Sequence, residues 1–530
     1  MHKNIVLMGD EAVALGALQA GISAAYSYPG TPATEIFEHV QRLCKKDTSL
    51  NVLCRWSINE KVALEEALGA SLIGKRALVS MKHVGLNVAA DPFMNASLTG
   101  TQGGLVICVA DDPSMHSSQN EQDSRFYSWF SKILCLEPID AQEAYDMTLL
   151  AFTLSEKWHL PIMIRLTTRV AHSRSNATLS EINHPQKRIT LPASFKNWML
   201  LPSNARPQFE LLWSKQNDLT QFSNHFEKNV LNIRPNTQKA VITGGLAHQY
   251  FMECGGADDY SYLRVCSYPL PKQKILALLQ NADELFVIEE GYPLIETLIY
   301  ECLHEIPHRI IVHGRHDKTV PQTGELNTDL VKKSLGYPTP TTTPATNDKL
   351  VRPRPPQLCK GCPHTDTFKA LNEALRGHEH ERVVFSDIGC YSLGYYPPHE
   401  AIHSGVCMGA SISMAKAAGE NGLKYAIAVI GDSTFEHSGI TPLLEGISRQ
   451  VNFTVIILDN SLVAMTGGQE RIMGAEQFVS FILGMGIDRD HLKIIHPIPK
   501  NHAENTRIIR EECEYQGPSV ILARRECLQK

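Results

Sequence analysis

Residues 425–469, YAIAVIGDSTFEHSGITPLLEGISRQVNFTVIILDNSLVAMTGGQ, contain two short apolar runs that each lead into a polar turn. The first run, AIAVI, stops at Gly431-Asp432-Ser433, and the second, TVIIL, leads into the turn that holds Asn460. Such runs are typical of parallel strands that are buried on both faces, and ligands bind at the carboxyl edge of such sheets. Asp432 and Asn460 are therefore expected to emerge side by side on neighbouring strands.

The chemistry of this pair indicates what binds at the edge. Asp432 and Asn460 both offer hard oxygen ligands, which suit Mg²⁺ holding a diphosphate. The helix that follows Ser433 would direct its free N–H groups at the same anion. Two core strands of an ordinary doubly wound domain, with solvated polar turns, would give the same local pattern.

The two turns also carry a family resemblance. Gly-Asp at one strand end and Asn after the next strand resemble the thiamine diphosphate (ThDP) enzymes. The tail DNSLVAMTGGQ closely resembles the equivalent turn of the 2-oxoacid:ferredoxin oxidoreductases, above all of the indolepyruvate:ferredoxin oxidoreductase large subunits. The resemblance implies that Mg²⁺ is held by Asp432, Asn460 and the backbone carbonyl of Leu462. It also implies cofactor contacts from Gly431, Ser433, Thr466 and Gly467.

Size and composition set the general class. A chain of 530 residues suggests about three domains. Hydrophobic residues at 43% and charged residues at 20% describe an ordinary soluble globular protein. A net charge of −6 and a pI near 6.4 argue against a nucleic-acid or membrane-surface partner. Every apolar run is shorter than the ~18–20 residues that a membrane span needs.

The N-terminus and the cysteines indicate a cytoplasmic protein. Asp10 and Glu11 interrupt the N-terminal apolar region, so a strand and an Ala-rich helix are expected there instead of a signal peptide. Thirteen cysteines without a secretion signal are expected as thiols or metal ligands in a reducing compartment.

Short apolar runs alternate with helical segments along the chain, a pattern that predicts three doubly wound α/β domains with mostly parallel sheets. Strands are expected at 77–81, 104–111, 160–166, 239–245, 284–291 and 309–314. The expected divisions are an α/β domain at 1–175, an irregular connection wrapping the surface at 176–236, a second α/β domain at 237–335, an extended Pro/Thr-rich linker at 336–357 and a third α/β domain at 358–530. By the family resemblance, the first domain binds the pyrimidine of ThDP, the second is similar to the transketolase C-terminal domain, and the third binds the diphosphate.

ThDP chemistry needs a carboxylate beside N1′ of the aminopyrimidine, where its hydrogen bond promotes removal of the C2 proton. The segment WSINEKVALEEALGASLIGKRALVSMKHVGLN closely resembles the family's catalytic-glutamate segment, and the matching residue is Glu60. Glu60 falls in the first turn of a predicted helix whose later positions supply apolar contacts. The alternative is that Glu60, Glu65 and Glu66 are all solvent-facing helix charges.

Three further segments of the first domain are candidates for the substrate site. SYPGTPATEIFE resembles the family's turn near the substrate, which makes Thr31 a predicted substrate contact, although a plain strand-to-helix turn has the same composition. Lys82 and His83 stand at a strand end and could face the reactive end of the cofactor; the alternative for His83 is a structural role. The polar segment 111–125 resembles the indolepyruvate branch. Its Arg125 could bind the substrate carboxylate or a partner protein, or the segment could be a solvated loop.

Met408 precedes Asp432 by 24 residues, a spacing similar to that in related ThDP folds. A bulky side chain is needed there to hold the cofactor in its bent form, and the alternative is a core methionine.

The cysteines decide the subclass. LCKGCPH contributes Cys359 and Cys362, and DIGCYSLG contributes Cys390. Zn²⁺ would be possible from the ligand type alone. The two motifs resemble the cluster-binding segments of the 2-oxoacid:ferredoxin oxidoreductases, where three such cysteines and a later one hold a [4Fe–4S] cluster. Cys527 is the expected fourth ligand, with Cys407 and Cys513 as rivals.

The resemblance implies oxidative decarboxylation of a 2-oxoacid, expected to be an aryl pyruvate, to the acyl-CoA with electrons passed to ferredoxin. It also implies a dimeric core or heterotetramer with a small partner subunit. Large subunits of this family commonly continue into a ferredoxin-like domain, whereas the sequence stops at Lys530. Onward electron transfer is therefore expected through a partner subunit or to a different acceptor. A non-oxidative ThDP decarboxylase or carboligase, or a non-catalytic scaffold, are the alternatives.

Overall fold

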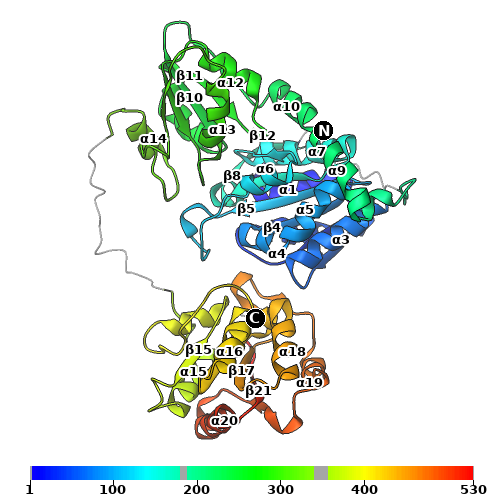
Figure 1. Ribbon diagram of the computed structural model, residues 1–530, viewed down its shortest axis with the longest axis vertical. Coiled ribbons are helices and arrows are strands. Elements are labelled where there is room, and N and C mark those ends of the chain that lie inside the picture. The colour runs from blue at the N-terminus through cyan, green and yellow to red at the C-terminus, as the bar shows by residue number, and fades with distance from the viewer. Residues whose placement is uncertain (1–2, 180–187, 340–355, 529–530) are drawn as a thin grey trace. The chain divides into compact units, whose positions relative to one another are not determined.

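The computed structural model describes residues 3–179, 188–339 and 356–528. It divides into two compact units, Met1–Thr342 and Thr343–Lys530. Both units are α/β, as predicted, and their large sheets are mostly parallel (Figure 1). Within the residues described, no helix combines the length and apolar character needed to cross a membrane.

The first sheet of the first unit has seven strands in the order β12-β6-β7-β5-β4-β2-β3. All neighbours are parallel except the terminal pair, β12 and β6. β4, β5 and β7 are buried along their whole length, which confirms the strands predicted from their continuous apolar runs. The bounds are β2 (Ala24–Ser27), β3 (Leu53–Trp56), β4 (Ala77–Lys82), β5 (Leu105–Asp111), β6 (Cys135–Leu136), β7 (Ile162–Thr167) and β12 (Ser267–Tyr268).

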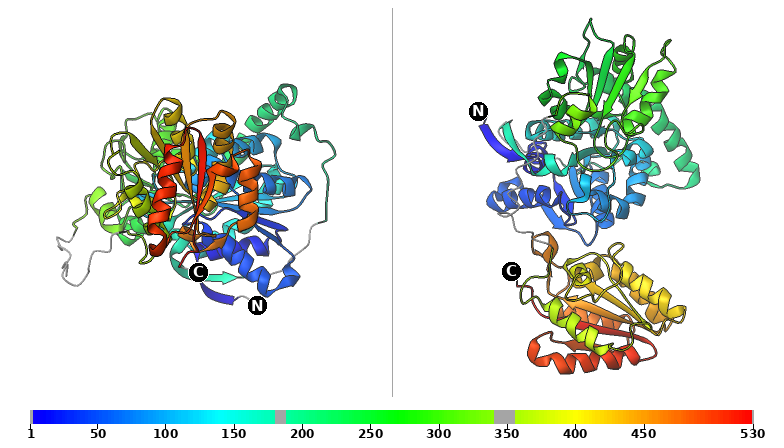
Figure 2. Two further views of the ribbon diagram at one scale, coloured as in Figure 1. Left: turned by 90° about the horizontal axis from the view of Figure 1, so that it is seen from below. Right: turned by 90° about the vertical axis from the view of Figure 1, so that its left-hand side faces the viewer.

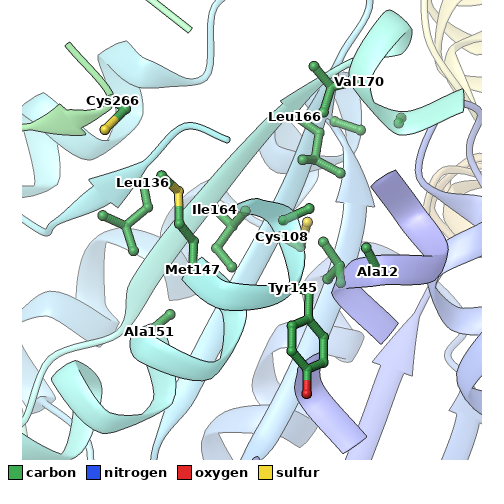
Figure 3. Close-up of a cluster of buried hydrophobic side chains, with 14 of the residues drawn as sticks. Ala12, Cys108, Leu136, Tyr145, Met147, Ala151, Ile164, Leu166, Val170 and Cys266 are labelled. Atoms are coloured by element: carbon green, nitrogen blue, oxygen red, sulfur yellow. The ribbon is translucent and has the colours of Figure 1, made fainter. Parts of the chain in front are cut away.

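Helices pack against this sheet and form its core. Figure 3 shows Ala12 of α1 and Tyr145 and Met147 of α7 lying against Cys108 of β5 and Ile164 of β7, in one continuous apolar core. The N-terminal strand β1 (Lys3–Met8) pairs antiparallel with β8 (Arg174–Leu179) in a separate ribbon. The helices are α1 (Gly9–Gln19), α2 (Thr34–Lys46), α3 (Glu60–Leu72), α4 (His83–Val88), α5 (Ala90–Thr99), α6 (Arg125–Ser131), α7 (Ala141–Trp158) and α8 (Thr168–His172).

The second sheet of this unit has the order β14-β13-β10-β11-β9, and three of its four neighbouring pairs are parallel. Its short strand β9 is antiparallel to β11. The predicted strands at 239–245, 284–291 and 309–314 are confirmed. The bounds are β9 (Leu231–Asn232), β10 (Lys239–Gly244), β11 (Ser261–Val265), β13 (Glu284–Ile288) and β14 (Ile311–His313), with helices α11 (Ala247–Glu253), α12 (Lys272–Leu279), α13 (Leu294–Leu303) and α14 (Thr328–Ser334).

The prediction of an irregular connection at 176–236 is wrong for much of its length. The structure places two helices there, α9 (Pro202–Ser214) and α10 (Gln216–His225). Pro202 occupies the first position of α9, where its missing N–H costs nothing, and α10 buries Leu219 in the core. The many Asn, Pro and Trp residues of this segment conceal the helical period. The predicted linker at 336–357 lies mostly outside the described residues.

The second unit contains one fully parallel sheet in the order β15-β16-β17-β21-β20. Successive residues of β16 alternate between two separate cores, so helices cover both faces of the sheet (Figure 2). The strands are β15 (Arg382–Phe385), β16 (Tyr425–Gly431), β17 (Phe453–Asp459), β20 (Leu492–Ile495) and β21 (Pro518–Arg524), with a small hairpin of β18 (Leu462–Val463) and β19 (Gln469–Glu470). The helices are α15 (Pro363–Ala374), α16 (Ala410–Glu420), α17 (Asp432–Thr434), α18 (Ile440–Ser448), α19 (Ala475–Gly484) and α20 (His502–Glu514).

Candidate cofactor and substrate sites

The carboxyl edge of the second unit brings its predicted ligands together. β16 and β17 are parallel with Gly431 opposite Leu458, so Asp432 and Asn460 leave the sheet next to each other. Asp432 accepts hydrogen bonds from the backbone N–H of Ser433 at 2.8 Å and of Ser461 at 2.7 Å. These bonds fix the carboxylate at the start of a helix. A metal ligand is expected there if the metal and the helix N-terminus hold the same anion.

The other two predicted metal ligands belong to the same hydrogen-bonded group. The side-chain oxygen of Asn460 accepts a bond from the N–H of Leu462 at 3.0 Å. The hydroxyl of Ser433 donates to the carbonyl of Leu462 at 3.4 Å. A carboxylate, an amide oxygen and a carbonyl oxygen are the donor types that Mg²⁺ takes, so these residues fit a magnesium ion.

The electrostatics of this edge combine carboxylates with positive side chains. Asp432 is only 2% exposed, and burial raises its pKa to about 7 even though Arg471 acts in the opposite direction. Asp459 lies close enough to contribute to the rise. Arg471 lies beside both carboxylates and Arg524 pairs with Asp459 at 2.7 Å, so positive groups already offset part of this negative charge.

Arg471 and Glu436 belong to this edge and were missed from the sequence. The guanidinium of Arg471 lies 3.1 Å from Asp459 and 3.6 Å from Asp432 and stacks over Phe478. Glu436 accepts bonds from the two N–H groups that follow Arg471, at 3.1 and 3.0 Å, and so anchors that loop. The position of Arg471, two residues after the TGGQ motif, is the signal that would have identified it.

Thr466 and Gly467 lie in the tight turn between β18 and β19. The Thr466 hydroxyl donates to the side chain of Gln469 at 2.7 Å, and Gly467 has a φ of 121°, which favours glycine. Met408 is half-buried and stands directly before Gly409, whose N–H donates to Asp387 at 3.2 Å. All three predicted cofactor contacts therefore lie in the unit that carries Asp432.

The four predicted cluster cysteines converge in the second unit. Burial raises the pKa of the Cys390 thiol to about 11, with further contributions from the nearby thiols of Cys362, Cys527 and Cys359. The N–H of Cys362 donates to the carbonyl of Cys359 at 3.0 Å, closing the C-x₂-C turn. Four thiols in one place are the ligand set of a cubane cluster, and a metal would offset the cost of their deprotonation.

The rival ligands lie in other surroundings. Cys513 is buried in α20, and its thiol interacts with the hydroxyl of Thr454. Cys407 is exposed, and the charge that acts on its thiol is Asp387. Cys527, unlike either rival, contributes to the raised pKa of the Cys362 and Cys390 thiols, so it stays the predicted fourth ligand.

Direct contacts link the four cysteines to the sheet edge that carries Asp432 and Asn460. The N–H of Cys527 donates to the carbonyl of Asn460 at 3.3 Å. On the other side, a Cβ added to Gly431 would lie 2.7 Å from the ring of Tyr391, which follows Cys390 in the chain. Tyr391 is bonded through its hydroxyl to Asp387, a buried carboxyl whose pKa burial raises to about 6. Asp387 and Tyr391 had no role in the sequence interpretation.

In the first unit, Glu60 is the first residue of α3 and is 6% exposed. The preceding Asn59 caps the helix by accepting the N–H of Val62 at 2.9 Å. Glu65 and Glu66 on the same helix are exposed. The alternative of three solvent-facing charges is therefore wrong for Glu60.

The neighbour of Glu60 is Gly85 of α4. A Cβ at Gly85 would lie only 2.5 Å from Oε1 of Glu60, so the carboxylate packs directly against the backbone of α4. Such a close approach explains the glycine, because any larger side chain would displace the carboxylate.

The polar segment after β5 covers the carboxyl edge of the first sheet. Lys82 donates to the carbonyl of Ser117 at 3.0 Å, and the Ser117 hydroxyl donates to the carbonyl of Thr31 at 3.4 Å. Nε2 of the buried His83 lies 3.2 Å from the carbonyl of Asn120. Burial lowers the pKa of Lys82 to about 8. Thr31, Lys82 and His83 are thus all linked to one loop.

The environment of Arg125 differs from that of a solvated loop and from that of an open site for a carboxylate. Its guanidinium is fully buried, paired with Asp123 and 2.9 Å from Glu289. It also donates to the carbonyls of Glu290 and Tyr292, at 2.9 and 3.0 Å. Arg125 ties the first sheet to the second, so neither a solvated loop nor an open carboxylate receptor describes it.

Comparisons with known proteins agree with this arrangement. Residues 15–240 match the family described as pyruvate flavodoxin/ferredoxin oxidoreductase, thiamine diP-bdg, and residues 387–521 match the thiamine pyrophosphate enzyme, C-terminal TPP binding domain. Indolepyruvate oxidoreductase subunit IorA of Archaeoglobus fulgidus is 35% identical over 99% of this chain and 86% of its own length. The Thermococcus kodakarensis subunit of that name is 34% identical over the same shares.

A solved 2-oxoglutarate:ferredoxin oxidoreductase from Magnetococcus marinus, with 2-oxoglutarate, coenzyme A and succinyl-CoA bound, is also similar. It shares 16% identity with this chain, with a TM-score of 0.47 over 59% of this chain and 62% of that chain.

The fold and the two matched domains define a ThDP-dependent oxidoreductase of 2-oxoacids. Two relatives with 34–35% sequence identity align along nearly the whole chain, and they narrow the class further. The chain belongs to the family of indolepyruvate oxidoreductase IorA subunits.

Proposed function

We propose that this chain catalyses the oxidative decarboxylation of indolepyruvate, or another aryl pyruvate, to the acyl-CoA, and that the electrons leave through a [4Fe–4S] cluster to ferredoxin. The observation that carries the proposal is the gathering of four thiols, those of Cys359, Cys362, Cys390 and Cys527, next to the edge that holds Asp432 and Asn460. A decarboxylase that released aldehyde would need no one-electron carrier at this place.

The metal and diphosphate contacts are assigned to the second unit. Asp432, Asn460 and the carbonyl of Leu462 hold Mg²⁺, and the N–H groups that begin the helix after Gly431 face the diphosphate. Met408 supports the cofactor from the adjoining helix start, and Ser433, Thr466 and Gly467 complete the contacts.

The aminopyrimidine contact is assigned to the first unit. ThDP supplies the decarboxylation chemistry when bound, and the protein supplies orientation and proton transfer. Glu60, buried and fixed by its helix cap, holds a proton in a hydrogen bond to the aminopyrimidine N1′. Thr31 and His83, linked through the loop over the sheet edge, contact the 2-oxoacid.

Other components of the reaction follow from the same proposal. Coenzyme A accepts the acyl group, and ferredoxin or a ferredoxin-like subunit accepts the electrons. The relatives are named as subunits, which supports assembly with a small partner subunit into a dimeric core or heterotetramer. Four clustered thiols also favour the reducing cytoplasm over an oxidising compartment.

The proposal is tested on protein purified anaerobically with its partner subunit. Iron analysis is expected to give about four irons per chain, together with an electron paramagnetic resonance signal on reduction. Indolepyruvate should be consumed only when both coenzyme A and oxidised ferredoxin are present.

Two matched variants sharpen this test. Cys527→Ser should lose the iron and the ferredoxin-linked activity, whereas Cys407→Ser, the same change at an exposed cysteine, should keep both. Iron-free protein with full activity would refute the cluster. Release of aldehyde without any electron acceptor would identify a non-oxidative decarboxylase instead.

A further inference from the structure

Three ligand-type side chains converge in the first unit, apart from the residues assigned to ThDP. They are Asp10 of α1, Glu35 of α2 and His172, the last residue of α8. One carboxylate oxygen of each acid and one imidazole nitrogen all lie within 4.8 Å of one another. Close packing of α1 against α8 brings them together, since a Cβ at Gly9 would lie only 2.3 Å from the carbonyl oxygen of Val170.

The polar atoms of this cluster are buried and not fully satisfied. Asp10 is 0% exposed, and neither of its carboxylate oxygens has a hydrogen-bond partner among the described residues. Oε2 of Glu35 and Nε2 of His172 lie 3.4 Å apart as an ion pair, and neither atom has a second partner among the described residues. Buried polar groups are almost always hydrogen-bonded, so the unpartnered carboxylate of Asp10, facing Glu35 and His172, indicates a missing ligand.

The charge of the cluster is only partly compensated, because His172 pairs with Glu35 at 3.4 Å and no cationic side chain among the described residues pairs with Asp10. Burial is the main cause that holds the pKa of Asp10 well above its usual range, and the nearby carboxylates of Glu35 and Glu11 raise this pKa further. His39 and Arg42, which lie near the cluster on α2, pair instead with Glu11, at 3.4 and 3.3 Å. A bound cation would supply the missing partner for the carboxylate oxygens of Asp10 and would be shared with Glu35.

We propose that Asp10, Glu35 and His172 bind a divalent first-row metal ion of the Mn²⁺ or Zn²⁺ type. Imidazole nitrogen favours such metals over Mg²⁺ and Ca²⁺, while two carboxylates supply the charge and oxygen ligands that Mn²⁺ and Zn²⁺ accept. The site is distinct from the edge at Asp432, whose donors are all oxygens.

The ion has both a route of entry and a structural consequence. Glu35 and Glu11 line a surface cavity of about 550 Å³ beside the cluster, so the ligands are reached from solvent. Glu35 is the second residue of α2, which begins shortly after the turn that holds Thr31. A bound ion would therefore pin the start of α2, and with it this turn, to α1 and α8.

The test uses the complete protein with its partner subunit and ThDP. The sample is dialysed against Mn²⁺ in the presence of excess Mg²⁺, which occupies the diphosphate site, and tightly bound manganese is then measured after gel filtration. Mn²⁺ is the probe because Zn²⁺ would also bind the cysteine group. The wild type is expected to retain a single equivalent of Mn²⁺ per chain, with the paramagnetic resonance spectrum of an immobilised ion.

Two variants of α2 provide the matched comparison. Glu35→Gln should lose the retained Mn²⁺, whereas Glu38→Gln, the same change at an exposed position one turn along the helix, should keep it. Asp10→Asn should also lose the ion while folding normally, because it replaces a buried carboxyl with a neutral group of the same shape.

Two outcomes would overturn the proposal. Wild-type protein that retains no Mn²⁺ under these conditions would show that Asp10 is simply a buried protonated acid. Equal retention by Glu35→Gln, Asp10→Asn and Glu38→Gln would place the ion elsewhere.

Discussion

Replacing Gly85 by alanine would test the role of Glu60 by displacing its carboxylate without changing the residue itself. The new Cβ would lie 2.5 Å from Oε1 of Glu60, whereas ordinary contacts begin at 3.4 Å, so the carboxylate must retreat by about 0.9 Å (3.4 − 2.5). A catalytic group misplaced by about 1 Å costs about 10²-fold in rate. We therefore expect Gly85→Ala to lower kcat about a hundredfold, which corresponds to about 2.7 kcal/mol of activation free energy.

Stability separates this effect from misfolding. Gly85 lies within the short helix α4, where alanine is favoured over glycine by roughly 0.5–1 kcal/mol, so contact strain and helix propensity oppose each other and unfolding is not expected. The matched control is Gly69→Ala in α3, the helix that carries Glu60, where a Cβ meets nothing within 4 Å. The assay is indolepyruvate turnover with coenzyme A and ferredoxin, alongside thermal unfolding and ThDP binding. Wild-type turnover in Gly85→Ala would refute the placement of Glu60 at the reacting cofactor.

Three further changes test other features. Arg125→Met leaves Glu289 buried without its paired guanidinium and leaves Asp123 with only the more distant Arg165, so it should lower the free energy of unfolding by about 3–5 kcal/mol in urea titrations. Burial raises the pKa of Glu290 from 4.5 to about 7, so the folded state binds the proton more tightly than the unfolded state does. Stability therefore falls as the pH rises between these values, by about 3.5 kcal/mol (a pKa difference of about 2.5 at ~1.4 kcal/mol each). Glu290→Gln should abolish this loss when unfolding is compared at pH 5 and pH 8. Gly409→Ala forces alanine to a φ of 84° and places its Cβ 2.6 Å from the Cβ of Ser438. Because of this strain, the change should destabilise the second unit by about 1–3 kcal/mol in the same assay.

Much of this architecture could be predicted from local pattern. The buried parallel strands appear as continuous apolar runs, and β16 and β17 end where the polar turns begin. The strand order that places Asp432 beside Asn460 follows from the rule that consecutive parallel strands are usually neighbours. For the same reason the sequence predicts that Asp432 and Asn460 emerge side by side, as they do in the structure.

The remainder depends on contacts between distant segments. Arg471 reaches Asp459 and Asp432 because the chain returns to the sheet edge after the hairpin, and the only local sign of that return is its place two residues after the TGGQ motif. The burial of Arg125 depends on residues more than a hundred positions later, which turn a polar segment into an internal ion pair. The helices α9 and α10 were missed because an amphipathic face that covers little of the core has a weak period.

The short strand β12 has a consequence for how the protein is made. Its two residues, Ser267 and Tyr268, complete a sheet whose earliest strand starts at Ala24. During synthesis the edge of β6 therefore stays open until most of the first unit has left the ribosome, and an open edge pairs readily with other chains. A gene split between the two sheets would leave the upstream product with this edge permanently exposed, so we expect the two segments to remain encoded in a single reading frame.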